Sequence, residues 1–329
     1  MKRLDYYWYT RSPWLLLLTP VSLVFRVAVW LRRMAYRSGL ARSHRIAVPV
    51  IVVGNITVGG TGKTPLVTWL AAYLQAKGHR PGIIARGYGG RARRWPQQVR
   101  PDSDPNIVGD EAVLLAGITR CPMAVGPNRV AAARALIEHS QCDVIISDDG
   151  LQHYKLQRDL EIAVIDGIRR FGTGFSLPAG PLREPVSRLQ EVDLVVVNGL
   201  GSGAEHPMRM RLQKACNLKD PAVVRELSDF RGQAVHAVAG IGNPERFFQA
   251  LQQKGMQVQG HAFPDHHRFA PADIGFADGR PVLMTEKDAV KCRHFASERD
   301  WYVPVKVELS AEFCARLDAL LEARLPNTR

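Results

Sequence analysis

The sequence predicts an α/β protein in which a mostly parallel sheet is flanked by helices, with a second, smaller α/β domain and a helical amino-terminal segment. The first observation is an alternation of helical stretches with short apolar, β-branched runs, which is typical of strands buried in a parallel sheet. These runs cover 50–53, 82–85, 144–147, 162–165 and 194–197. The second observation is a glycine-rich turn between the first run and a helix. The third is a new series of strand and helix patterns that begins near Gly232.

Length and composition are those of a folded protein with room for two modest domains. The chain has 329 residues, of which 46% are hydrophobic and 23% are charged, so a disordered or low-complexity protein is excluded. The five cysteines are odd in number and contain no CxxC pair, which argues against a disulfide framework and against a zinc site. Buried thiols in a reducing compartment fit this pattern better.

Positive charge is concentrated near the amino terminus. Lys and Arg number 44 against 31 Asp and Glu, a net charge of +13, and residues 1–45 contribute +8 of it through nine basic residues and one acidic residue. Such a concentration indicates an anionic partner. Nucleic acid, anionic lipid and phosphorylated substrates all fit this observation alone.

Residues 4–38 have the composition of a helix that lies at a membrane surface. Aromatic residues around Trp8 precede a charge-free run, Ser12–Phe25, and arginines follow it. The run is shorter than the ~20 residues that span a bilayer, and Pro20 and Arg26 interrupt it. A secretory signal peptide is disfavoured because no small-residue cleavage site precedes Arg26. We predict an interfacial helix on an anionic membrane, with a helix packed on the protein core as the alternative.

The first apolar run, Val50–Val53, leads into a glycine-rich loop and then a helix whose first turn contains Pro65. Glycines allow the backbone N–H groups of such a loop to point at one phosphate chain, and the helix start adds a positive field. This strand–loop–helix order is that of P-loop NTPase-like folds, although the loop opens with threonine where glycine is usual. The expected nucleotide-binding residues are Thr57, Val58, Gly59, Gly60, Thr61, Gly62, Lys63 and Thr64.

Four residues have specific roles in the P-loop pattern. Lys63 is expected to reach the β- and γ-phosphates of ATP, and Thr64 is expected to ligate Mg²⁺. A P-loop also needs an acidic element on a neighbouring strand, and one apolar run is followed directly by Asp148 and Asp149. We predict that these two aspartates hold the metal and its water. A solvated turn at a strand end is the alternative.

Three classes of P-loop protein compete for this sequence. A GTP-binding switch needs an Asn-Lys-x-Asp motif, but Gly-Leu-Gly follows Asn198. A membrane ATPase that dimerises over ATP carries a signature lysine where this chain has Val58. A kinase for a small or lipid-like acceptor needs a carboxylate near the γ-phosphate, and Asp110, at the start of a predicted helix, is a candidate. A simple helix cap is the alternative role for Asp110.

Taken together, the motifs resemble those of the tetraacyldisaccharide 4′-kinase family, the lipid A 4′-kinases of Gram-negative bacteria. They occur in the family order over nearly the whole chain, with Leu151 in place of a frequent phenylalanine as one mild departure. The matching segments are Gly54–Pro65, Arg86–Gly89, Gly109–Glu111, Asp148–His153, Gly180–Pro185, Phe263–His267 and Thr285–Asp288.

The resemblance implies a kinase that uses ATP and Mg²⁺ and phosphorylates the 4′-hydroxyl of tetraacyldisaccharide 1-phosphate, giving lipid IVA. Its glycolipid acceptor lies in the cytosolic leaflet, so the implied location is the cytoplasmic face of the bacterial inner membrane. An interfacial anchor and arginines suit a lipid-embedded substrate with an anionic headgroup. The implied anionic partners are therefore this membrane surface and the glycolipid, and not nucleic acid.

The resemblance also implies catalytic residues. Asp110 is expected to accept or orient the 4′-hydroxyl proton, assisted by His266 or His267, and the sequence leaves that choice open. Arg129 and Arg183 are expected to clamp phosphate oxygens, because a planar guanidinium binds such oxygens in pairs. The alternatives are a turn cap for the Asp-His-His segment and solvated surface positions for the two arginines.

The remaining patterns place the domain boundaries. Further strands are expected at 234–239, 281–284 and 301–307, and the Gly-Ile-Gly at 240–242 lacks the third glycine of a dinucleotide-binding loop. Because Asp110 and the histidines fall in different units, we expect the two units to close over ATP and lipid during catalysis. The predicted boundaries are 1–45 for the membrane-associated segment, 46–230 for the kinase domain, 231–309 for the smaller α/β domain and 310–329 for the carboxy-terminal helix.

Overall fold

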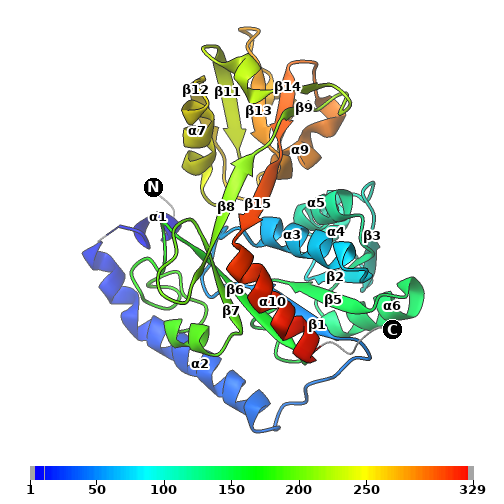
Figure 1. Ribbon diagram of the computed structural model, residues 1–329. Coiled ribbons are helices and arrows are strands. Elements are labelled where there is room, and N and C mark those ends of the chain that lie inside the picture. The colour runs from blue at the N-terminus through cyan, green and yellow to red at the C-terminus, as the bar shows by residue number, and fades with distance from the viewer. Residues whose placement is uncertain (1–3, 11, 325–329) are drawn as a thin grey trace.

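The structure, a computed structural model, describes residues 4–10 and 12–324. Figure 1 shows a large α/β unit, a smaller α/β unit above it, and a long helix, α2 (Thr19–Arg37), along the lower edge of the large unit. The strands in this described part of the chain form two sheets, one of nine strands and one of six. The predicted fold class, a mostly parallel sheet flanked by helices with a second α/β domain, is confirmed.

The large sheet contains the five predicted strands at its centre. Its strands are β1 (Val50–Gly54), β2 (Pro81–Ala85), β3 (Gln97–Val99), β4 (Met123–Val125), β5 (Val144–Asp148), β6 (Leu160–Asp166), β7 (Leu194–Asn198), β8 (His206–Leu212) and β15 (Val305–Leu309). Their order is β15-β8-β7-β6-β1-β5-β2-β4-β3. Among these described strands, β15 and β3 at the two edges are antiparallel to their neighbours, and the inner strands are all parallel.

Helices cover both faces of the large sheet. They are α3 (Lys63–Ala76), α4 (Pro105–Val108), α5 (Asp110–Thr119), α6 (Arg129–Ser140) and α10 (Ala311–Arg324). Along β1, Ile51 and Val53 belong to a core shared with α3, α5 and α10. Val50 and Val52 belong to a second core, shared with α6. Because alternate residues of a strand point to opposite faces, a strand covered on both sides is apolar throughout, which is why these runs were recognisable in the sequence.

The smaller sheet has the order β10-β9-β14-β13-β11-β12. Its elements are β9 (Ala215–Asn217), β10 (Val224–Arg225), β11 (Ala234–Ala239), α7 (Pro244–Gln253), β12 (Gln257–Ala262), α8 (Pro271–Ile274), β13 (Val282–Thr285), α9 (Glu286–Cys292) and β14 (Asp300–Val303). The first strand of this sheet, β9, precedes position 231, where the sequence placed the start of the unit. β9 and β10 are only three and two residues long, which is too short to show a period.

One predicted strand, 301–307, is two strands that belong to different sheets. β14 ends at Val303 in the smaller sheet, and β15 begins at Val305 in the large one. Pro304, between them, has no backbone N–H to donate to a ladder, and its carbonyl accepts from Gln213 N at 2.9 Å. β15 pairs antiparallel with β8, so this two-stranded ribbon joins the units (Figure 1).

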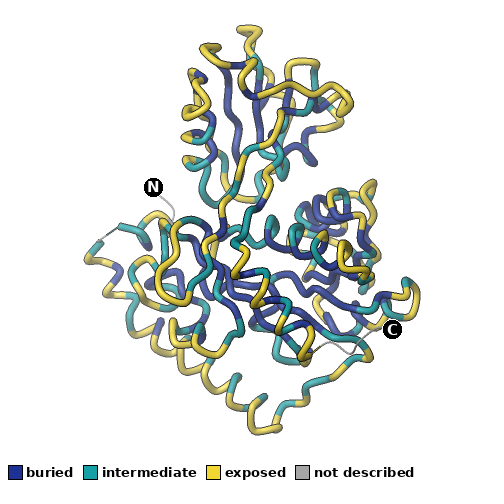
Figure 2. The backbone as a smooth tube through the Cα atoms, viewed as in Figure 1, coloured by how far each residue is buried: buried dark blue, intermediate teal, exposed yellow. Residues whose placement is uncertain are grey.

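The amino-terminal segment forms α1 (Leu4–Tyr7), a 3₁₀ turn at Pro13–Leu18, and α2. Pro20 lies in the first turn of α2, where no backbone N–H donor is needed, so it does not interrupt the helix. The helix also continues through Arg26 to Arg37, beyond the end of the charge-free run at Phe25. The stretch Pro13–Arg37 has the length and apolar composition of a membrane-crossing helix. Most of its residues are exposed (Figure 2); the exposed apolar ones include Trp14, Leu16, Leu17, Val21, Leu23, Val24, Val27, Trp30, Leu31 and Met34.

The amino-terminal segment also contacts the loop 176–184. Ser22 is the one buried residue of α2, all of which the structure describes, and its Oγ accepts a hydrogen bond from Ala179 N at 2.9 Å. The indole N–H of Trp8 donates to the Pro178 carbonyl at 2.9 Å. Pro181, in the same loop, accepts from Val58 N at 2.8 Å. One loop therefore lies between the amino-terminal helix and the glycine-rich loop after β1.

Candidate active site

A cavity of about 1060 Å³ lies between the two units, where β1, β5, β6 and β7 end. The large unit contributes Lys63 and both aspartates of the acidic turn, and the smaller unit contributes His266 and Lys287. Ligands of parallel α/β sheets bind at the carboxyl ends of strands, so this is the expected position for a substrate site. Other predicted site residues that line it are Val58, Gly59, Gly60, Thr61, Gly62, Thr64 and Arg183.

The glycine-rich loop is curled in the way that the sequence predicts. Gly59 and Gly62 have φ values of +103° and +100°, which glycine adopts without the strain that a side chain would cause. The Asn55 amide holds the curl from inside by donating to the Gly59 carbonyl at 3.4 Å and to Thr61 Oγ1 at 3.3 Å. α3 begins immediately after this loop, so free backbone N–H groups and the positive helix end face the cavity.

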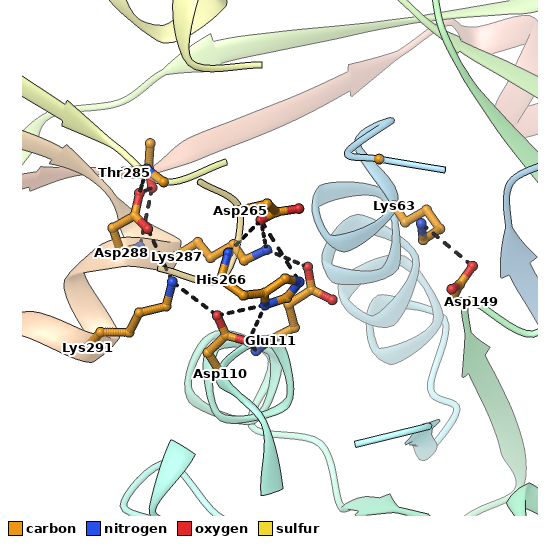
Figure 3. Close-up of polar contacts among 12 residues, drawn as sticks. Lys63, Asp110, Glu111, Asp149, Asp265, His266, Thr285, Lys287, Asp288 and Lys291 are labelled. Carbon is orange, nitrogen blue, oxygen red and sulfur yellow. Dashed lines mark hydrogen bonds and ion pairs between the residues drawn. The ribbon is translucent and has the colours of Figure 1, made fainter. Parts of the chain in front are cut away.

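Asp148 and Asp149 lie beside Lys63, as the P-loop interpretation requires. Lys63 Nζ is 3.6 Å from Asp149 Oδ1 (Figure 3). Burial, reinforced by the nearby Glu111 carboxylate, raises the pKa of Asp148 to about 7. Burial also acts to raise the pKa of Asp149, but Lys63 and Arg183 outweigh it and hold that pKa below its usual value. Asp148 Oδ1 is buried and has no hydrogen-bond partner among the described residues, which leaves an oxygen donor available.

Arg183 binds the acidic turn from the cavity side. Its guanidinium donates to both carboxylate oxygens of Asp149 at 2.8 and 3.0 Å and also contacts Asn55. Its backbone N–H donates to the Ile56 carbonyl at 2.7 Å, so the loop that carries Arg183 is fixed against the glycine-rich loop. Arg183 is therefore not a solvated surface arginine.

Arg129 is placed differently from Arg183. It is 6% exposed, and its Nη2 donates to the backbone carbonyls of Asp149 at 2.8 Å and Asp148 at 3.4 Å. Of the residues that the structure describes, those lining the cavity do not include Arg129. The guanidinium thus supports the acidic turn through its backbone carbonyls. Thr57, also outside the lining, is buried and forms a backbone bridge with Leu182.

The two histidines of the Asp-His-His segment have different partners. His266 Nδ1 lies 3.0 and 3.1 Å from the carboxylate oxygens of Asp110 (Figure 3). The His266 ring centre is 5.1 Å from that of Tyr88. His267 Nε2 instead lies 3.0 Å from Asp273, within its own unit, and its ring stacks on Phe263. The structure therefore pairs His266, and not His267, with Asp110.

Charge partners shift the pKa of both members of this pair. The hydrogen bond with Asp110 raises the pKa of His266. Burial acts to raise the pKa of Asp110, but His266, Lys287 and Lys291 together bring it well below the usual value. At neutral pH the carboxylate is thus ionised, and the imidazole binds a proton more strongly than an isolated histidine does.

Lysines of α9 and glycines of two loops bring the units together. Lys287 Nζ lies 2.8 Å from both Glu111 Oε1, in the large unit, and Asp265 Oδ1, in the smaller one (Figure 3). At the glycine-rich loop, a Cβ added to Gly242 would lie 2.6 Å from Gly60 N, so only glycine allows these backbones to touch. The Gly-Ile-Gly of the smaller unit packs against the glycine-rich loop through Gly242.

Several cavity residues were not predicted individually. Arg86, Arg169, Asn198 and Arg246 all line the cavity. Arg86 lies in a matching family segment, so a signal for it was present. Asn198 ends β7 and donates to the Thr61 carbonyl at 3.2 Å, a contact that depends on strand order and is not visible in the sequence.

Comparisons with known proteins agree with this arrangement. The family model of tetraacyldisaccharide-1-P 4′-kinase matches residues 14–322. A tetraacyldisaccharide 4′-kinase of Nitrosococcus oceani is 58% identical over 316 residues, covering 96% of this chain and 93% of that protein. The tetraacyldisaccharide 4′-kinase of Alkalilimnicola ehrlichii is 50% identical, covering 99% of this chain and 98% of that one.

A solved structure supports the same conclusion. A crystal structure of LpxK from Aquifex aeolicus in complex with ATP has a TM-score of 0.78 and 27% sequence identity, and the match covers 95% of this chain and 99% of that one. The predicted family and the predicted kinase activity are confirmed, and neither the GTP-binding switch nor the membrane ATPase is favoured. The chain belongs to the tetraacyldisaccharide-1-P 4′-kinase family.

Proposed function

We propose that this kinase transfers the γ-phosphate of ATP to the 4′-hydroxyl of tetraacyldisaccharide 1-phosphate, giving lipid IVA. The observation that carries the proposal is a single cavity lined by two sets of groups. Lys63 and Asp149 lie 3.6 Å apart on one side, and on the other side is His266, whose Nδ1 lies 3.0 Å from Asp110 behind it. A phosphate-binding loop and a proton-accepting pair are the two components that transfer to a hydroxyl needs.

The residues around Lys63 fit a nucleotide and its magnesium ion. The curled loop and the start of α3 offer N–H donors for the phosphates, and Lys63 adds a positive charge. Thr64, Asp148 and Asp149 would hold Mg²⁺, because a hard cation prefers hydroxyl and carboxylate oxygens, and Asp148 Oδ1 has no other partner among described residues. When bound, the ion would neutralise charge on the phosphates. Arg183, already aligned by Asp149, adds a planar donor on the cavity side.

The pair Asp110–His266 is proposed to take up the hydroxyl proton. His266 lines the cavity, and Asp110 lies behind it, buried at the start of α5. A proton that leaves the acceptor hydroxyl would reside on the imidazole, because the ionised carboxylate stabilises the imidazolium form. Arg129 is proposed to keep the acidic turn in place without contacting phosphate, and His267 is assigned a structural role.

Incubation of the purified protein with ³²P-labelled ATP and the lipid disaccharide monophosphate tests this function. Appearance of a labelled lipid bisphosphate is the expected result, and omission of Mg²⁺ should suppress it. Hydrolysis of ATP that is independent of the lipid, with no labelled lipid, would contradict the proposal. Stimulation of that hydrolysis by DNA or RNA would point to a different class of ATPase.

The membrane partner is proposed to be the cytoplasmic face of the inner membrane, with α2 lying on it. The exposed apolar side chains of α2 are continuous along one face, and Arg26 and Arg32 are available to anionic lipid. The lipid acceptor would then reach the cavity from the bilayer without leaving it.

Removal of residues 1–40 should release the protein from vesicles that contain phosphatidylglycerol. That deletion also removes Trp8 and Ser22, so a second variant is needed that keeps the contacts with the loop 176–184. Replacing Leu23, Val24 and Trp30 with glutamine alters only side chains that are 62%, 70% and 58% exposed. We expect this variant to remain folded, by circular dichroism, and to lose co-sedimentation. Vesicle binding that persists in both variants would place the anchor elsewhere.

A further inference from the structure

The family segment Thr285–Asp288 opens helix α9, and the function proposed above assigns no role to most of it. Thr285 caps this helix, and Asp288 and Lys291 follow three residues apart, so their side chains lie on one face. α9 belongs to the smaller unit but packs against α5 of the large unit, the helix that begins with Asp110. A basic residue on this face thus comes next to the proton-accepting pair.

Lys291 contacts the catalytic carboxylate directly. Its Nζ lies 3.1 Å from Asp110 Oδ2 and 3.4 Å from Asp288 Oδ1 (Figure 3). The side chain of Lys291 is 10% exposed, and Nζ also lies 5.6 Å from the centre of the Phe269 ring. A largely desolvated ammonium group between two carboxylates holds both in place more firmly than a surface ion pair would.

Asp288 connects Lys291 to the loop that contacts the phosphate-binding loop. It is fully buried, and its Oδ2 accepts hydrogen bonds from Thr285 Oγ1 at 2.6 Å and from Gly240 N at 2.8 Å. Gly240 begins the short loop after β11, and Gly242, two residues later, is the glycine that touches Gly60 of the phosphate-binding loop. A continuous series of contacts therefore runs from Asp110 through Lys291, Asp288 and Gly240 to Gly60.

We propose that Lys291, together with Asp288, is a positioning residue for phosphoryl transfer. Lys291 fixes the Asp110 carboxylate in the orientation that His266 needs, and Asp288 ties this carboxylate to the loop that rests on the phosphate-binding loop. These contacts fix the distance between Asp110, on the side of the acceptor hydroxyl, and the phosphate-binding loop, on the side of ATP. The inference rests on the proposed function, because it assigns Asp110 to the reaction.

Lys287 does not duplicate this arrangement. It lines the cavity and binds Glu111 and Asp265, so its loss would disturb the substrate site itself. Lys291 is not among the described residues that line the cavity, so it touches neither the nucleotide nor the acceptor. An effect of Lys291 on turnover would therefore be transmitted through Asp110.

The test compares Lys291→Gln, Lys291→Arg and Asp288→Asn with the full-length enzyme, using Lys254→Gln, an exposed lysine after α7, as the matched control. Because a shift of about 1 Å in a catalytic group can cost ~100-fold in rate, we expect Lys291→Gln to lower kcat by roughly 10- to 100-fold. The KM for ATP should change by no more than about twofold, because Lys291 does not line the cavity and the substitution should affect the chemical step and not ATP binding. Lys291→Arg keeps the charge and should recover most of the rate, and Lys254→Gln should match the wild type.

Each outcome decides the question. An unchanged kcat in Lys291→Gln would overturn the proposal, as would equal losses in Lys291→Gln and Lys291→Arg, which would indicate packing alone. If Lys291→Gln fails to fold, Asp288→Asn, which preserves the side-chain size, must still lower kcat without raising the KM for ATP. The wild type is assayed alongside: a wild type that makes no lipid bisphosphate contradicts the proposed function, whereas an active wild type with an unaffected Lys291→Gln contradicts only the positioning role.

Discussion

Replacing Lys63 with alanine is expected to lower phosphoryl transfer by at least about 1,000-fold, the scale of effect seen when a cation that stabilises transferred phosphate is removed. Lys63 is the first residue of α3 and lies in the cavity at the end of the glycine-rich loop, 3.6 Å from Asp149. The substitution removes the charge that would meet the β- and γ-phosphates. It also leaves Asp149 with one fewer cationic partner.

The matched control lies at the opposite end of the same helix. Lys77 follows the last residue of α3 and pairs with Asp318 at 2.8 Å, far from the phosphate-binding loop. Lys77→Ala also removes one lysine and should leave the rate of lipid bisphosphate formation unchanged. Transfer of ³²P from ATP to the lipid would be measured for both variants, with thermal unfolding as the check on folding. Wild-type transfer by Lys63→Ala would remove the phosphate-binding loop from the mechanism.

Asp110→Asn and His266→Ala are each expected to lower kcat by about 100- to 10,000-fold, because the loss of a positioned proton acceptor has effects of this size. Both should leave the affinity for ATP nearly unchanged, since neither residue belongs to the glycine-rich loop. His267→Ala is the control, because its ring pairs with Asp273 and stacks on Phe263 in the smaller unit. Steady-state kinetics with varied ATP and varied lipid separate kcat from KM. Equal losses in ATP affinity and turnover would make Asp110 a binding residue.

The dependence of kcat on pH gives a second measurement on the same variants. Asp110 raises the pKa of His266 above 6.5, so proton uptake by the pair requires a pH above that raised value. The rate of the wild type should therefore fall as the pH is lowered through the raised pKa of His266. In Asp110→Asn the imidazolium loses its carboxylate partner, so the residual activity should fall at a lower pH than in the wild type. If the pH dependence of kcat is the same in Asp110→Asn as in the wild type, Asp110 does not control the pKa of His266.

The central strands and the phosphate-binding loop could be predicted because their signals are local. β1, β5 and β6 are buried along their whole length because both faces are covered, so each contains an apolar run, and Gly59 and Gly62 occupy positions that need a positive φ. Local sequence signals do not predict the break at Pro304. The residues on both sides of it fit a single strand, and only the pairing of β15 with β8 shows that the second half belongs to another sheet.

The candidate site was predicted in its parts but not in its assembly. Asp110 and His266 are 156 residues apart in different units, so which histidine meets the carboxylate depends on how those units pack. Two adjacent histidines with the same local sequence cannot be distinguished before that packing is known. The family resemblance implied a phosphate clamp at Arg129, but nothing in the sequence indicated that its guanidinium donates to the carbonyls of the acidic turn. Lys291 gave no signal of its own, because a lysine on a short helix is commonplace.

The ribbon formed by β8 and β15 has a consequence for biosynthesis. The smaller unit is inserted between these two strands, so a ribosome completes it before β15 and α10 are made. Val307, Phe313 and Leu317, from these last elements, share a core with Leu66 and Met208, which are translated much earlier. The edge of the large sheet at β8 and one face beneath it thus remain uncovered while the inserted unit emerges and folds. We expect the nascent chain to need protection from aggregation during this interval, until β15 pairs with β8 and α10 packs on the large sheet.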